Sequence, residues 1–168
     1  MKIRDAINEI LDELPDEELQ KLYWSIRIFH EHYAFNRTLQ DKGVVISPLY
    51  EDREHIKACW DKAFAHHVPD EIKEAIHYDQ YKWHLFSYEQ ADCLQAEEAR
   101  AAFDQMVKGD LYVMYQHGPD VFLYEHAKDL VSTDFDAQQD IYVFDREFSW
   151  TYVHTHEAMC GPYFATSK

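Results

Sequence analysis

The spacing of hydrophobic residues changes part-way along this chain, and that change limits the possible folds more than any other feature. Up to about residue 80, most apolar side chains recur every three or four residues, as in an amphipathic helix. From Tyr81 the period changes, and apart from one further helix the apolar residues then come in short runs separated by turn residues, which is typical of strands. Helices followed by strands predict an α+β protein, with N-terminal helices packed with a mostly antiparallel sheet of about five strands.

The first part of the chain predicts a helical hairpin with an acidic outer face. Pro15 separates two amphipathic helices, and the three acidic residues that follow it suit the positive end of the second helix dipole. We expect the second helix to run to about residue 37. Gly43 then breaks the pattern. The expected organisation is a hairpin over residues 1–42 and an α+β domain over residues 43–168, which together form one compact unit.

Shorter elements are expected in the rest of the chain. A strand at 44–46 should precede a helix that starts at Ser47–Pro48, with Ser47 as its cap, and carries Trp60. The further expected elements are a helix over 69–77, a strand over 83–87, a helix over 97–107, and hairpins over 111–124 and 141–153. Several strands are apolar on both faces, so helices should cover at least one side of the sheet.

Acidic residues outnumber basic ones by 32 to 16, and the formal net charge is −16. A field of that sign repels phosphate backbones and anionic lipid surfaces. We therefore expect no nucleic-acid and no membrane partner, and a basic protein as the favoured partner. The alternative is that the charge only keeps the protein soluble.

Cysteine and glycine usage excludes several common classes of site. The three cysteines form no C-x-x-C pair, so we expect free thiols in a reducing cytoplasm. The N-terminus has no apolar signal-peptide core, and no apolar run reaches the ~20 residues of a membrane span. The four glycines are scattered, which leaves no phosphate-binding loop and no dinucleotide fingerprint. We expect no cofactor.

The histidines are the most suggestive polar feature. His154 and His156 lie two residues apart near the end of an expected strand, where both side chains point to the same side. With Glu157 they are candidate metal ligands, and Glu157 is alternatively a general base. A third ligand would have to come from His84, His117 or His126. The alternative is that the histidine pair lies on a wet strand face as ordinary polar residues.

Residues from about 47 to 164 resemble a bacterial family known as domain of unknown function four-two-seven-five. The matching motifs are Trp60 with Phe64–Ala65, Trp83–Tyr88, Asp140–Val143, Trp150–Val153, Thr155–Glu157 and Gly161–Phe164. This resemblance implies no activity, but it marks His84, Thr155, His156 and Glu157 as part of the family pattern. The N-terminal segment around Pro15 is similar to short helical segments of antitoxin-like proteins.

Aromatic residues surround the histidine pair, as in many binding surfaces, although they are equally suited to filling a core. The candidate binding residues are therefore His84, Trp150, Tyr152, Thr155, His156, Glu157 and Tyr163. The favoured hypothesis is a non-enzymatic acidic binding protein of the immunity or antitoxin kind that neutralises a basic protein. The alternatives are a small metal-assisted hydrolase that uses His156 and Glu157, and a structural or regulatory oligomer formed through the N-terminal helices.

Overall fold

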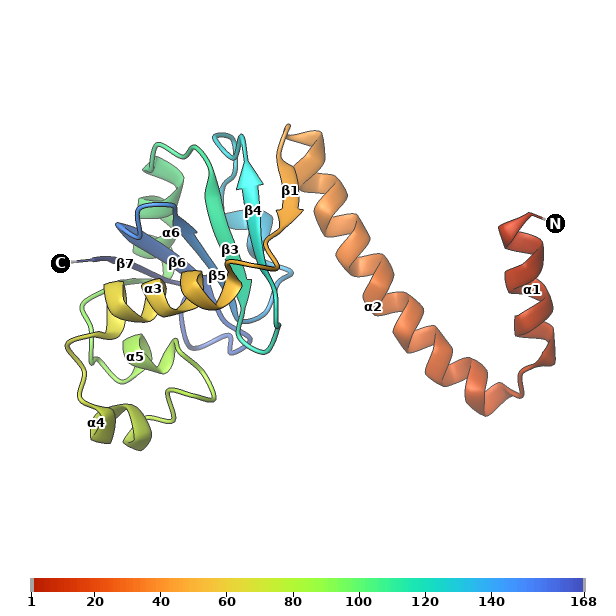
Figure 1. Cartoon of the computed structure of the whole chain (residues 1–168), viewed down its shortest axis with the longest axis horizontal. Helices are drawn as coiled ribbons and strands as arrows, with labels where there is room; N and C mark the ends of the chain where they lie inside the picture. The colour runs from red at the N-terminus through yellow and green to blue at the C-terminus, as the bar shows by residue number, and fades with distance from the viewer. Residues whose placement is uncertain (1, 168) are drawn as a thin grey trace. The chain divides into compact units, whose positions relative to one another are not determined.

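The computed structural model describes residues 2–167 and divides into two compact units, residues 1–38 and residues 39–168 (Figure 1). The first unit holds two helices, α1 (Ile3–Glu13) and most of α2 (Asp16–Asp41). Both helices were expected, and α2 continues four residues beyond the expected end. Helix α1 buries none of its own side chains. The pairing of the two helices as a hairpin therefore stays a prediction.

The second unit is built on a seven-stranded sheet in the order β1-β4-β3-β5-β6-β7-β2. Its strands are β1 (Val45–Pro48), β2 (Leu94–Gln95), β3 (Leu111–Tyr115), β4 (Val121–Glu125), β5 (Ile141–Asp145), β6 (Trp150–His154) and β7 (Tyr163–Thr166). Its helices are α3 (Arg53–Ala65), α4 (Asp70–Ala75), α5 (His84–Ser87), α6 (Ala96–Gln105) and the 3₁₀ helix η1 (Ser132–Phe135). Every pairing is antiparallel, which confirms the α+β class with seven strands in place of five.

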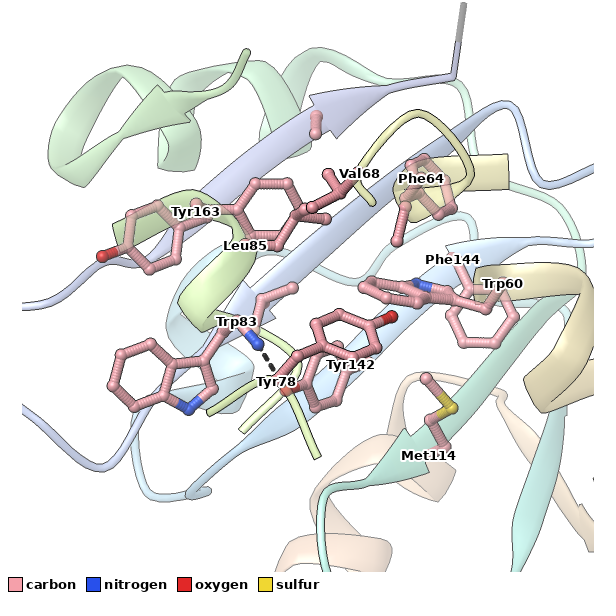
Figure 2. Packing of buried hydrophobic residues seen from close by; sticks show 14 of the residues in the cluster. Trp60, Phe64, Val68, Tyr78, Trp83, Leu85, Met114, Tyr142, Phe144 and Tyr163 are labelled. Carbon is pink, nitrogen blue, oxygen red and sulfur yellow. Dashed lines mark hydrogen bonds between the residues drawn. The ribbon is translucent and has the colours of Figure 1, made fainter. Parts of the chain in front are cut away.

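Helices cover both faces of the sheet (Figure 1). On one face, Trp60 of α3 packs edge-on against Tyr142 of β5 at 5.3 Å, and the Trp60 indole N–H donates to the Thr151 hydroxyl at 3.1 Å (Figure 2). On the other face, Phe103 of α6 packs on Tyr152 of β6 at 4.6 Å. Successive strand side chains alternate between faces, so a strand covered on both sides is apolar throughout. All residues of Ile141–Phe144 and Trp150–Val153 are accordingly buried.

Two local predictions were wrong. The segment expected as a strand over 83–87 instead holds the short helix α5, which Trp83 precedes as the N-cap residue, with i-to-i−4 backbone bonds from Ser87 to Trp83 and from Tyr88 to His84. One helical turn buries Leu85 and Phe86 together, whereas a strand would send adjacent side chains to opposite faces. The other error is Ser47–Pro48, which ends the edge strand β1. An edge strand tolerates proline because it need not donate on its outer side.

The two predicted β-hairpins are confirmed in strand position and pairing. The helices expected after Ser47, over 69–77 and over 97–107 are present as α3, α4 and α6, with the bounds given above. Within residues 2–167, no helix combines the length and the apolar character that crossing a bilayer requires.

Candidate functional site

An open cleft of about 680 Å³ lies in the second unit where three segments meet. These segments are the first turns of α6, the connection from η1 to β5, and the connection from β6 to β7. The charged residues of the lining are Glu97, Arg100, Asp136 and Glu157. Arg100 already pairs with Asp136 at 2.6 Å and lies 3.8 Å from Glu97, so the cleft carries a surplus of negative charge.

His156 lines this cleft and pairs with Asp140, which lies just outside the lining. The Nδ1 atom of His156 lies 2.9 Å from both carboxylate oxygens of Asp140, and the backbone N–H of His156 donates to the same carboxylate at 3.2 Å. An ionised carboxylate only accepts hydrogen bonds, so Nδ1 carries the proton. The Nε2 atom of His156 is not used by Asp140 and is left for a ligand. The His156 side chain is 31% exposed, and that of Asp140 is 12% exposed.

Asp140 is held from several directions. It has a positive φ of 52° just before β5, and its side chain accepts a 2.9 Å hydrogen bond from the indole N–H of Trp83. The Trp83 backbone N–H in turn donates to the Tyr142 hydroxyl at 3.0 Å (Figure 2). The Tyr142 hydroxyl donates to the side-chain oxygen of Gln116 at 2.5 Å. This network ties the loop before α5 to the central strand β5 and fixes the orientation of His156.

Aromatic rings complete the surroundings of His156. The Tyr81 ring lies 5.0 Å from the His156 ring, and the Trp83 ring lies 5.8 Å from it. Tyr81 also contacts His84 at 5.4 Å and His117 at 5.3 Å. The rings of three histidines therefore contact the Tyr81 ring, although these histidines come from segments far apart in the sequence.

The loop after His156 presents Glu157 to the cleft. Its carboxylate lies 3.7 Å from Nε2 of His156, beyond hydrogen-bonding distance, and its side chain is 51% exposed. Thr155 closes this loop, because its buried hydroxyl contacts the backbone carbonyls of Glu157, at 3.1 Å, and of Cys160. The loop thus fixes one carboxylate beside one imidazole.

Cys160 lines the same cleft, but its environment does not favour a nucleophile. Burial raises the pKa of the Cys160 thiol, and the Glu157 carboxylate, which accepts its hydrogen bond at 3.3 Å, raises it further. Attack requires the thiolate form, which both effects disfavour. These surroundings therefore favour the protonated thiol near neutral pH.

His154 and His156 do not converge on one point. Nδ1 of His154 donates to the backbone carbonyl of Gln138 at 2.8 Å, and its Nε2 faces Asp136 at 3.9 Å. His156 faces Glu157 instead. Among residues 2–167, no three His, Cys, Asp or Glu side chains are grouped closely enough to hold a metal ion. Two of the predicted ligands do lie side by side, since Nε2 of His156 is 3.7 Å from the Glu157 carboxylate.

The other predicted site residues do not lie directly beside His156 and Glu157. His84 donates from Nδ1 to the Ile76 carbonyl at 2.6 Å and reaches His156 only through Tyr81. The side chains of three aromatic candidates are buried in the core: Trp150, Tyr152 and Tyr163. Burial raises the pKa of Tyr152, whose hydroxyl has no hydrogen-bond partner in the described part of the chain. None of the three lines the cleft.

Sequence reasoning did not assign roles to Asp140, Trp83, Arg100 or Asp136. Asp140 is 16 residues from His156 in the chain, and only the antiparallel pairing of β5 with β6 brings the two together. The one available signal was the pair of family motifs that contain Asp140 and Trp83. Arg100 reaches the cleft from α6, and the sequence of this helix contains no motif of polar residues that would have indicated a site.

Comparison with known proteins agrees with the predicted resemblance. No curated protein and no solved structure matches the chain. The family model described as domain of unknown function (DUF4275) matches residues 33–164, which include the whole sheet except the last two residues of β7, together with the cleft and the His156–Asp140 pair. The chain therefore belongs to the DUF4275 family.

Proposed function

We propose that this protein is a non-enzymatic binding protein whose acidic cleft receives a basic protein partner. The observation that carries the proposal is the charge of the cleft. Three carboxylates line it, and its single guanidinium is already paired with one of them. The unit around it, residues 39–168, has 24 acidic against 11 basic residues.

The carboxylates are accessible enough to meet a partner. The side chain of Glu97 is 93% exposed, and those of Asp136 and Glu157 are about half exposed. A lysine or arginine side chain of the partner can enter among them and donate to these oxygens, with the imidazole of His156 beside it. Opposite fields speed encounter and disfavour wrongly charged partners. The three unpaired cysteines suit a reducing compartment, and we place this role in the cytoplasm.

A metal-assisted hydrolase gains no comparable support. His156 and Glu157 would supply two donors, but no third donor accompanies them in the described part of the chain. Catalytic zinc sites use three protein ligands. The Cys160 thiol, which lies nearby, is kept protonated by its surroundings.

The test compares cleft and control variants with matched loss of charge. Glu97→Gln/Glu157→Gln removes two cleft carboxylates, whereas Glu51→Gln/Glu71→Gln removes two exposed carboxylates elsewhere in the same unit. Proteins captured from native cytosol at low and moderate salt are identified by mass spectrometry. The partner's affinity for each purified variant is then measured by titration calorimetry.

We expect to capture a basic protein. It should bind the wild type and the control variant with equal affinity, and it should bind the cleft variant roughly tenfold or more weakly. A tenfold loss corresponds to about 1.4 kcal/mol, the low end of measured couplings for close charge pairs at interfaces. Equal binding of the partner to both variants would contradict the assignment to the cleft. Capture of no basic protein at either salt concentration would contradict the proposal as a whole.

A further inference from the structure

Helix α2 carries an apolar stripe with the repeat of a coiled coil. Its members alternate three and four residues apart: Leu19, Leu22, Ile26, Phe29 and Tyr33. Ile26 is 50% exposed, Phe29 73% and Tyr33 58%. A stripe of this kind is stable in water only when another surface covers it.

The preceding helix cannot cover all of the apolar surface of α2. Helix α1 has one stripe of its own, with Ile3, Ile7 and Ile10 exposed and spaced four and three residues apart. Helix α2 is also apolar on a second side, where Trp24 and Ile28 are both more than half exposed. One short helix with one stripe can cover either the stripe of α2 or the side that carries Trp24 and Ile28, but not both. A further partner is therefore needed for the side that α1 does not cover.

We propose that this partner is the α2 helix of a second copy of this chain, packed antiparallel about a two-fold axis near Ile26. In this arrangement Ile26 meets its own counterpart, Leu22 meets Phe29, and Leu19 meets Tyr33. Each layer then combines a large side chain with a smaller one, or two of intermediate size. The same face serves both copies, which closes the assembly at two.

The charges beside the stripe favour this orientation. Antiparallel packing places Asp16 opposite Arg37, Glu18 opposite His32, and Tyr23 opposite His30 of the other copy. Parallel packing would instead place His32 beside Arg37 and leave the acidic first turn without a basic neighbour. Residues 19–30 contain no Asp or Glu, in a chain of net charge −16. Self-repulsion between two copies is therefore weakest along this stretch.

The stripe supplies part of the area that a stable dimer needs. Its exposed large apolar side chains are Ile26, Phe29 and Tyr33, and the exposed Tyr23 lies beside it. With about half or more of each side chain exposed, these four offer on the order of 100 Å² each, or roughly 400 Å² per chain. This is about half of the ~800 Å² that a standard interface buries per partner.

Solution mass of the full chain tests the proposal. We expect light scattering to give twice the chain mass of 20.1 kDa for the wild type. Ile26→Asp/Phe29→Asp should reduce the mass to that of one chain. Gln20→Asp/Thr38→Asp, which adds the same charge at exposed positions off the stripe, should leave the dimer intact. Near-ultraviolet circular dichroism and cooperative unfolding show whether the sheet domain of each variant is folded.

A crosslink tests the orientation without disturbing the stripe. Ser25 lies beside the two-fold axis, so Ser25→Cys should form an intermolecular disulfide on mild oxidation. Gln20→Cys lies on the outer side of the same helix, and its yield of intermolecular disulfide should not exceed the wild-type background. A wild type with the mass of one chain at every concentration would overturn the proposal, because α2 would then be covered otherwise. A dimeric Ile26→Asp/Phe29→Asp variant, or equal crosslinking of both cysteine variants, would also overturn it.

Discussion

Asp140 collects hydrogen bonds from the Trp83 indole, the His156 backbone and the His156 ring, although its side chain is mostly buried. A carboxylate in such a place costs free energy unless donors surround it, and here they do. The same bonds assign the proton of His156 to Nδ1 and direct Nε2 away from Asp140. One aspartate therefore stabilises the fold and also sets the chemistry of the cleft.

We predict that Asp140→Asn lowers the free energy of unfolding by about 1–3 kcal/mol, because the side-chain amide replaces one acceptor by a donor facing the His156 proton. Chemical denaturation followed by tryptophan fluorescence measures the loss. Nitrogen chemical shifts of His156 should also show that the Nδ1–H form is no longer preferred. The exposed Asp129→Asn is the matched control and should change stability by less than about 0.5 kcal/mol. A fully stable Asp140→Asn protein would contradict the role assigned to the carboxylate.

Among the elements, the connection from β6 to β7 shapes the cleft most directly. It begins with His154–Glu157 and returns through Gly161 to β7, whose Tyr163 is buried in the core. Gly161 has a φ of +90°, and a Cβ there would lie 3.1 Å from the Tyr163 ring. Glycine is required at this position for both reasons. The cleft loop thus depends on one backbone conformation.

Gly161→Ala should destabilise the protein by about 1–3 kcal/mol, the usual cost of a non-glycine residue in a sparsely populated backbone region. Gly109→Ala provides the control, since its φ lies outside the positive region and nothing lies within 4 Å of an added Cβ. Thermal unfolding of both variants measures the difference. Equal melting temperatures for the two would show that the loop relaxes without cost.

For the molecule as a whole, a sheet covered on both faces buries several tyrosine hydroxyls. Burial raises the pKa of six tyrosines: Tyr78, Tyr115, Tyr124, Tyr142, Tyr152 and Tyr163. In the unfolded chain these groups ionise near their ordinary pKa of about 10. The folded state keeps their protons at a pH where the unfolded state has lost them. Their contribution to stability is thus complete below about pH 10 and is lost as the pH rises above it.

We therefore expect the free energy of unfolding to fall steeply above about pH 10, with tyrosine ionisation and loss of structure occurring together. Ultraviolet absorbance reports ionisation, and far-ultraviolet circular dichroism reports the fold in the same titration. Ionisation of all twelve tyrosines near pH 10 in a protein that remains folded would contradict this prediction.

The sequence alone was sufficient for the fold class, both β-hairpins and most helices, because helical and strand spacing are local patterns along the chain. It was not sufficient for Trp83–Ser87, where five residues fit either spacing and only packing on the sheet selects the helical turn. It also placed Trp150, Tyr152 and Tyr163 beside the histidines without showing that they point into the core. The pairing of His156 with Asp140 came only from the tertiary structure, since strand register decides which distant residues meet.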